Sequence, residues 1–128
     1  MAFQEGVGLR NGKLNSYNTT LGATSTLKIF SGAEPANCAA ADPSGLLATM
    51  TLPASPFAAA SGGVIALNGT WSVAGTNPGI AASFRIYDSS AVCQFQGNTT
   101  TDLVLNNTNI TAGQIVTVTS FGVTSGNP

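Results

Sequence analysis

The stretch Ala82-Ser83-Phe84-Arg85-Ile86-Tyr87-Asp88 decides the fold class of this chain. Its apolar residues Phe84 and Ile86 alternate with other residue types, which is the two-residue period of a β-strand with one face on a core. The stretch therefore predicts a strand that buries Phe84 and Ile86 and turns Tyr87 toward solvent.

The same two-residue period recurs along most of the chain after Gly22. Turn clusters rich in Gly, Pro, Asn and Asp separate the periodic segments at intervals of roughly 8–12 residues, as in antiparallel sandwiches and barrels. No later segment has the pattern of a crossover helix, so a parallel sheet is not expected. Besides the stretch above, the predicted strands are Thr24–Phe30, Leu46–Leu52, Val64–Leu67, Thr70–Ala74, Ala91–Gln96, Asp102–Leu105 and Gln114–Val123.

These strands predict an all-β fold, an antiparallel β-sandwich of about eight short strands. Asn68-Gly69 lies between two of them and is the dipeptide favoured in a type I′ turn, so it predicts a hairpin. The apolar faces of the strands predict the core, which comprises Leu27, Ile29, Met50, Leu52, Trp71, Val73, Phe84, Ile86 and Phe121.

Residues 1–21 precede the β segments and follow a different pattern. Apolar residues recur at helical spacing from Val7 onward, and Gly22 follows where a helix commonly ends. We expect a short helix, with an extended arm as the alternative, because two glycines and several asparagines weaken helical propensity. The chain then divides into this N-terminal element and a single β-sandwich domain over 22–128. The apolar stripe of the expected helix consists of Leu14, Tyr17 and Leu21.

The composition argues against catalysis and against nucleic-acid binding. The 128 residues include four Lys or Arg, five Asp or Glu and no His, so 7% are charged, against about a quarter in ordinary domains. Catalysis at neutral pH usually relies on such side chains with tuned pKa values. Four basic residues also cannot form the positive stripe that neutralises phosphates. We therefore expect a protein that is not an enzyme, has no cofactor or metal, and does not bind nucleic acid.

The two cysteines leave two interpretations open. The chain starts without the basic and apolar regions of a signal peptide, and no run of about 18 apolar residues could span a membrane, so synthesis in a cytoplasm is expected. In that reducing compartment Cys38 and Cys93 would be small buried thiols. A disulfide between them is the alternative, and it requires a geometry that the sequence does not supply.

Three other groups of residues fit a structural explanation better than a functional one. The Asn-X-Ser/Thr sites follow from an Asn- and Thr-rich composition without a secretory signal. Asp88 and Asp102 could hydrolyse a glycoside if held about 5–10 Å apart, but both lie at strand ends, where Asp commonly closes turns. An aromatic platform for sugars would use Tyr17, Trp71 and Tyr87, yet Trp71 follows the pattern of a core residue.

Three stretches, taken in order, carry a resemblance to known proteins. The first is Leu27-Lys28-Ile29-Phe30-Ser31-Gly32 followed by Pro35, close to an LxIYxGxxP opening. The second runs from Leu46-Leu47-Ala48-Thr49-Met50-Thr51-Leu52 into residues 57–64. The third joins Ala82–Asp88, Asp102–Leu105 and Ile110–Val116. In order and spacing these stretches resemble a group of small structural proteins encoded among the head genes of tailed bacteriophages and prophages.

The resemblance implies a virion component, above all a decoration (cement) protein on the outside of the capsid. Such proteins are commonly compact β folds, often jelly-roll-like, that act as dimers or trimers. The expected partners are therefore the major capsid protein and further copies of this chain, and no membrane is involved. The expected location is the capsid surface, after synthesis in the host bacterial cytoplasm. Cys38, Cys93 and the Asn/Thr-rich stretch 97–111 depart from the family pattern.

Residues 1–21 are the predicted attachment element, because they are too apolar for a solvated tail and precede the β domain. A helix that only caps the β domain is the alternative. Two further functions stay open: a tail or head–tail junction protein with the same fold and, from a different class, a carbohydrate-binding module. The predicted capsid or oligomer contacts are Phe3, Val7, Leu9, Arg10 and Lys13.

Overall fold

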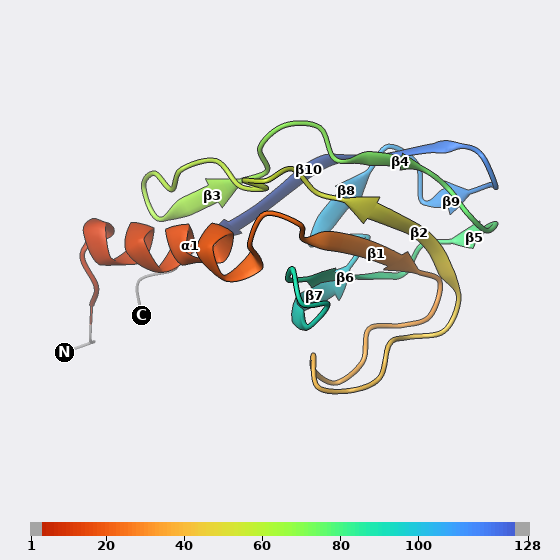
Figure 1. Ribbon diagram of the computed structural model, residues 1–128, viewed down its shortest axis with the longest axis horizontal. Helices are drawn as coiled ribbons and strands as arrows, with labels where there is room; N and C mark the ends of the chain where they lie inside the picture. Colours follow the sequence, from red (N-terminus) through yellow and green to blue (C-terminus); the bar gives the residue numbers. More distant parts are fainter. Residues whose placement is uncertain (1–3, 125–128) are drawn as a thin grey trace.

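The computed structural model describes residues 4–124, which form one N-terminal helix followed by antiparallel sheets (Figure 1). All eight predicted strands are present, and two short strands, β5 and β9, were not predicted. The elements are α1 (Val7–Leu21), β1 (Thr26–Phe30), β2 (Leu46–Thr51), β3 (Val64–Ala66), β4 (Ser72–Ala74), β5 (Gly79–Ile80), β6 (Ser83–Tyr87), β7 (Cys93–Asn98), β8 (Leu103–Leu105), β9 (Asn109–Ile110) and β10 (Ile115–Thr124).

The larger sheet has the strand order β2-β1-β6-β7, with every pair antiparallel. Its cross-strand register places apolar residues in rows on the face toward the core, such as Met50–Leu27–Ile86–Phe95. In the neighbouring row Phe84 lies opposite Gly97, where an added Cβ would come within 2.8 Å of the Phe84 ring. Only glycine therefore lets the ring lie over β7.

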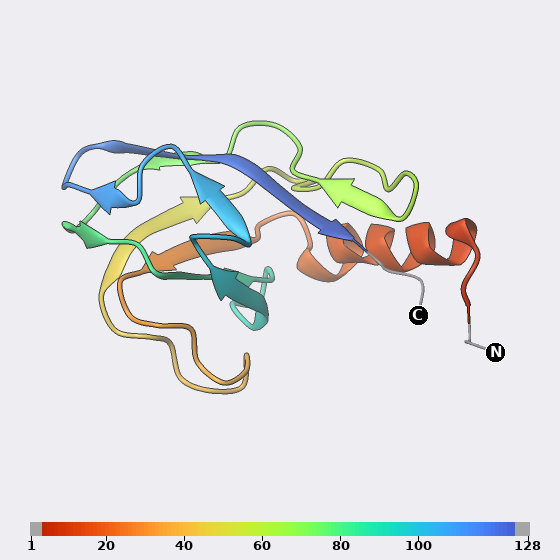
Figure 2. The same ribbon diagram turned by 180° about the vertical axis from the view of Figure 1, so that it is seen from behind.

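The long strand β10 organises the remaining β structure and runs along most of the molecule (Figure 2). The first part of β10 pairs with β4, its last part pairs with β3, and β8 pairs with its middle. Strands β5 and β9 form a separate small sheet. The core lies where these strands, the larger sheet and α1 meet.

The predicted hairpin at Asn68-Gly69 is wrong, because β3 and β4 do not pair with each other. On one side of this dipeptide Leu67 N–H donates to Phe121 O, and on the other Val118 N–H donates to Trp71 O. Both strands are thus held by β10, and the residues between them form a bulge in a nearly continuous ladder. The positive φ of Gly69, 73°, fits a bulge as well as a turn, which is why the dipeptide misled the prediction.

The predicted core is confirmed, with one adjustment: Val73 is half-buried and packs against the cluster rather than inside it. Phe57, which was not predicted, lies at the centre of the aromatic packing. Its ring centroid is 5.5 Å from that of Trp71 and 5.9 Å from that of Phe121. The chain has few aromatic residues, and it gathers most of them into this cluster.

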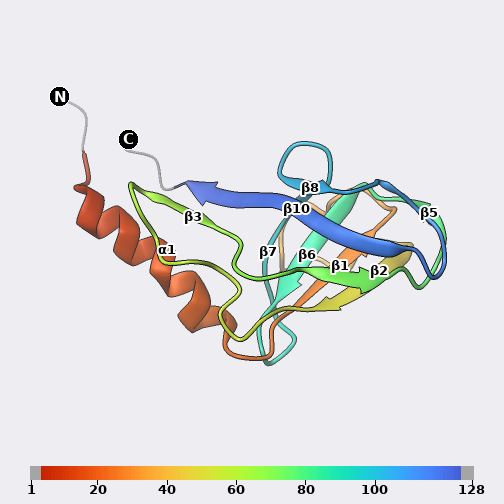
Figure 3. The ribbon, with the colours of Figure 1, turned by 90° about the horizontal axis from the view of Figure 1, so that it is seen from above.

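The predicted helix is confirmed in position and in its packing. Leu14 and Leu21 are buried, Tyr17 packs against the core, and Gly22 ends the helix with φ 77° and an N–H bond to Asn18 O. Figure 3 shows α1 lying along one side of the β structure, next to β3. Among the described residues, no helix has the length and apolar content needed to cross a membrane.

Asparagine side chains also attach α1 to the segment before β3. Asn18 donates to Phe57 O (2.8 Å) and accepts from Phe57 N–H (3.0 Å). One turn earlier Asn15 accepts from Ala60 N–H, and Asn11 accepts from Gly63 N–H, both at 2.8 Å. Spaced three and four residues apart, the asparagines share one side of the helix and supply hydrogen-bond partners for a segment that has few strand partners of its own.

Strand β6 departs from the prediction on its outer face. All five of its residues are buried, including Arg85 at 2% and Tyr87 at 6% exposure. The prediction that Tyr87 faces solvent is therefore wrong. The physical reason is residues 31–45, here called the cover loop, which join β1 to β2 and lie on the side of the larger sheet away from β10 (Figure 1).

Candidate functional site

The cover loop is closed at its base by backbone hydrogen bonds. Ser31 N–H donates to Gly45 O (2.9 Å) and Gly32 N–H donates to Ser44 O (3.0 Å), so the two ends of the loop leave the sheet together. Ser83 Oγ of β6 also donates to Gly32 O at 2.6 Å. A long connection without secondary structure of its own is usually functional or held by its own contacts. The contacts of this loop centre on Arg85.

The Arg85 guanidinium binds three residues of the cover loop and one of β7 at once. Its Nε donates to Gln96 Oε1 on β7 (3.1 Å), Nη1 donates to Ala40 O and to Asp42 Oδ1 (both 3.0 Å), and Nη2 donates to Asn37 O (3.0 Å). The planar group presents its donors in a fixed fork, which matches this spread of acceptors. Arg85 thus ties the cover loop to β6 and β7.

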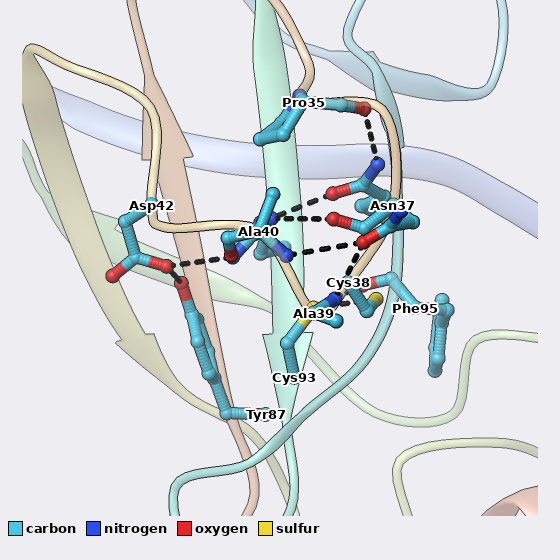
Figure 4. A network of polar contacts seen from close by, with 11 residues as sticks. Pro35, Asn37, Cys38, Ala39, Ala40, Asp42, Tyr87, Cys93 and Phe95 are labelled. Carbon is cyan, nitrogen blue, oxygen red and sulfur yellow. Dashed lines mark hydrogen bonds and ion pairs between the residues drawn. The ribbon is translucent and has the colours of Figure 1, made fainter.

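Asp42 receives a second donor from the sheet, the Tyr87 hydroxyl, at 2.5 Å (Figure 4). This hydrogen bond is the largest effect on the pKa of the Asp42 carboxyl and, with the help of Arg85, holds that pKa below its ordinary value, although burial acts in the opposite direction. Burial and the same hydrogen bond raise the pKa of Tyr87. Lys28 Nζ lies 5.0 Å from the Tyr87 ring centroid, within cation–π range. Asp42 and Tyr87 are thus held in their ionised and neutral forms, respectively, at neutral pH.

Amide side chains complete the network around the loop. Gln96 accepts from Arg85 and uses its Nε2 to donate to Pro35 O at 2.6 Å. Asn37 Oδ1 accepts from Ala39 N–H (3.0 Å) and Ala40 N–H (3.1 Å) (Figure 4). The resulting turn places Asn37 O where it accepts from Arg85. This asparagine turn organises the loop locally.

The cysteines lie at the edge of the same network, one on the cover loop and one at the start of β7. The Sγ atoms of Cys38 and Cys93 are 2.6 Å apart, and both residues are half-buried reduced thiols (Figure 4). Burial, together with the neighbouring Cys38 thiol, raises the pKa of Cys93 to about 12. A thiol with a raised pKa is a poor nucleophile at neutral pH.

This arrangement suits a structural role better than a chemical one. Four of its hydrogen bonds occupy the Arg85 donors, so the cation has little capacity left for a ligand. No cluster of three or more His, Cys, Asp or Glu that could hold a metal occurs among residues 4–124. The site therefore holds a long loop in one conformation against the sheet.

The predicted contact residues of the N-terminal segment are partly exposed. Val7 is 49% and Leu9 57% exposed on the first turn of α1, whereas Arg10 is half-buried. Lys13 Nζ forms an ion pair with Glu5 Oε2 at 2.6 Å. Phe3 lies outside the described residues.

Exposed aliphatic side chains occur at both ends of the long axis. Val64 on β3 is 43% exposed and lies at the same end as the start of α1. At the opposite end Ile80 on β5 is 67% exposed, and Ile115 at the start of β10 is 57% exposed (Figure 1). Single exposed aliphatics are ordinary; among the described residues three of the seven large exposed ones lie at one end and two at the other, while Val92 precedes β7 and Val104 lies on β8. The sequence periodicity did not indicate this second end.

The residues considered for sugar binding and glycoside hydrolysis are not assembled as such sites. Trp71 is fully buried and Tyr87 is bound to Asp42, so neither ring is exposed for stacking on a sugar. Asp88 accepts from Ser90 N–H and Val92 N–H in the turn after β6. Asp102 likewise accepts from a backbone N–H in the turn before β8. These hydrogen bonds give both carboxylates the turn-closing role considered for them.

Two open hollows flank Tyr17 and Phe95, between α1, β7 and β10. The smaller, of about 150 Å³, is lined by Ser16, Tyr17, Thr20, Leu21, Gln94 and Phe95. The larger, of about 420 Å³, has a floor of Phe84 and Phe121 and a rim that includes Gln96 and Asp102. Both rim groups are already hydrogen-bonded within the protein, and the lining of the larger hollow mixes polar and apolar side chains.

Comparison with known proteins adds no relative to this picture: no family model, no curated protein and no solved structure matches the chain.

Proposed function

We propose that this chain is a structural protein of a tailed-phage virion, a decoration protein that binds the outer surface of the head and stabilises it. The observation that carries the proposal is the presence of exposed aliphatic side chains at both ends of the molecule, on a chain whose stretches resemble small phage head proteins. A molecule with exposed aliphatic side chains at both ends can contact two neighbours at once. Such bridging is the task of a cement protein.

The low charge of the chain supports the same function. With a formal net charge of −1 and few ionic groups, copies approach one another with little electrostatic repulsion. In a lattice, each further contact forms at high effective concentration, so weak individual interfaces suffice. We propose that the copies associate as dimers or trimers and contact the major capsid protein, with Val7 and Leu9 at the attachment end.

The proposal extends to the architecture. The larger sheet and the sheet built on β10 have the antiparallel pairing expected of a jelly-roll-like sandwich, the fold that the sequence resemblance implies. Hydrogen bonds hold the two longest irregular parts of the chain in place. Arg85 binds the cover loop, and the asparagines of α1 bind the segment before β3. A rigid subunit suits a protein that must resist pressure inside a capsid.

The test is reconstitution on particles that lack the protein. Purified chain is mixed with such particles, and bound copies are counted by quantitative mass spectrometry and located by cryo-electron microscopy. Many copies in a symmetric arrangement on the head are expected. Binding confined to the tail or the head–tail junction, or no binding, overturns the decoration proposal.

Point variants then test which ends make contact. Val7→Ser with Leu9→Ser changes one end, and Ile80→Ser with Ile115→Ser changes the other; all four side chains are exposed, so folding should be unaffected. We expect each pair to lower occupancy on the head at least tenfold, with an unchanged melting temperature. The matched control is Val92→Ser, which changes a 53% exposed valine in the turn between β6 and β7. If the control lowers occupancy as much, the ends are not the contacts.

A further inference from the structure

The cover loop brings together two thiols that are distant in sequence. Cys38 and Cys93 are 55 positions apart, yet their Sγ atoms lie 2.6 Å from each other. A disulfide bond needs about 2.05 Å between its sulfur atoms, so the two sulfur atoms need to move only slightly closer to form a bond. Figure 4 shows both side chains meeting between the loop and the sheet.

The residues next to each cysteine explain why the thiols stay together. Cys38 directly follows Asn37, whose carbonyl oxygen is bound by Arg85. Cys93 lies opposite Tyr87 in the β6–β7 ladder, and Tyr87 binds Asp42 of the same loop. The polar network therefore positions both sulfur atoms before any bond between them exists.

We propose that Cys38 and Cys93 form an intramolecular disulfide that locks the cover loop onto β7. The inference does not depend on the proposed function, because it concerns only the chain itself and the redox state of its surroundings. The polar network holds the loop while the thiols are reduced. The bond then makes the closed loop permanent under oxidising conditions, such as those outside a cell.

The oxidant is a disulfide of low molecular weight, such as oxidised glutathione, acting by two exchange reactions. First the Cys38 thiolate attacks one sulfur of the oxidant, which releases one thiolate and leaves a mixed disulfide on Cys38. Then Cys93 loses its proton and its sulfur attacks Cys38 Sγ, releasing the second thiolate. Two protein thiols are oxidised and one small disulfide is reduced to two thiols.

The order of attack follows from the environment of Cys93. Because burial raises its pKa, Cys93 remains protonated while the first exchange occurs. The second step is intramolecular and benefits from the short distance between the two sulfur atoms. Both residues are half-buried, so a small oxidant can reach them where a large protein surface cannot.

The experiment uses the full chain in reduced and oxidised glutathione buffers. Thiol titration should fall from two reactive groups to none, with the loss of two hydrogen atoms in the intact mass and one linked peptide pair containing Cys38 and Cys93. On a non-reducing gel the protein should stay monomeric. Two titratable thiols that persist in excess oxidised glutathione, or a cross-link between chains, overturn the inference.

Stability gives an independent readout. The bond closes a loop of more than fifty residues, so oxidation should raise the melting temperature by about 5–15 °C. It should also slow amide exchange in residues 31–45. The double variant Cys38→Ser, Cys93→Ser should melt at the same temperature in both buffers. An equal rise in that variant would show that the buffer, not the disulfide, stabilises the protein.

Discussion

Replacing Arg85 with Met should release the cover loop and destabilise the whole protein. Methionine retains much of the aliphatic stem but none of the donors. Two loop carbonyls and Gln96 Oε1 then lose their partner in a covered site, where each unmade hydrogen bond costs about 1–3 kcal/mol. Asp42, whose side chain is 44% exposed, stays hydrated and adds little. Since removing the guanidinium also removes its cost of burial, we expect a net loss toward the lower end of the sum of these three hydrogen bonds, about 3–5 kcal/mol.

The assay is urea denaturation, with the free energy of unfolding obtained from the midpoint and slope. Hydrogen exchange of residues 31–45 adds a local measurement, which should increase in the variant even where the sheet stays protected. The free energy of unfolding of Arg85→Lys should lie between those of the wild type and Arg85→Met. An ammonium keeps the charge but cannot reach acceptors on the loop and on β7 together.

Lys28→Met is the matched control. Lys28 lies opposite Arg85 in the β1–β6 ladder, on the same face of the sheet, and its removal deletes the same charge. Its cation–π contact with Tyr87 contributes about 0.5–1 kcal/mol, so its loss should cost less than about 1 kcal/mol. Equal midpoint shifts for the two variants would refute the reasoning, since charge alone would then explain the effect.

Three further predictions follow from the packing and the network. Phe84→Ala should cost about 3–5 kcal/mol in urea denaturation, and an unchanged midpoint would show the strand register to be wrong. Gly97→Ala should destabilise, because its Cβ would lie 2.8 Å from the Phe84 ring, whereas Gly12→Ala, with open space in α1, should stabilise by about 0.5–1 kcal/mol. The pKa of Asp42 is lowered from 3.8, so its contribution to stability is complete above about pH 4 and is lost as the pH falls through the lower folded value. Acid titration of Asp42→Asn should lack this loss.

Strand positions were predictable because the pattern is local. Eight segments with a two-residue period all became strands, and the helical stripe ending at Gly22 became α1. The short strands β5 and β9 escaped prediction because two residues carry no period. The pairing of β3 with β10 escaped for a different reason: Asn68-Gly69 satisfies a bulge as well as a turn, and only the position of β10 decides between them.

The network around Arg85 was not predictable from any local pattern. A strand with alternating polar residues normally has one face in water, so Tyr87 was predicted to face solvent, and Arg85 lies on the same face. What decides their burial is a loop more than forty residues earlier in the chain, which supplies two backbone carbonyls and one carboxylate, that of Asp42, to the guanidinium. Every residue has a backbone carbonyl, so a sequence does not indicate which carbonyls will accept from a buried guanidinium.

One signal could still have indicated that network. A chain with only four basic residues places one of them at the centre of its most regular strand, between Phe84 and Ile86. A strand residue of that kind, if covered, needs several acceptors to offset its desolvation. The turn-rich segment 31–45, with its Asn, Asp and many carbonyls in irregular backbone, is such a source. In a chain with so few charged residues, a charged residue within a strand is therefore a reason to look for a segment that covers it. For Arg85 that segment is the cover loop, which also brings Cys38 next to Cys93.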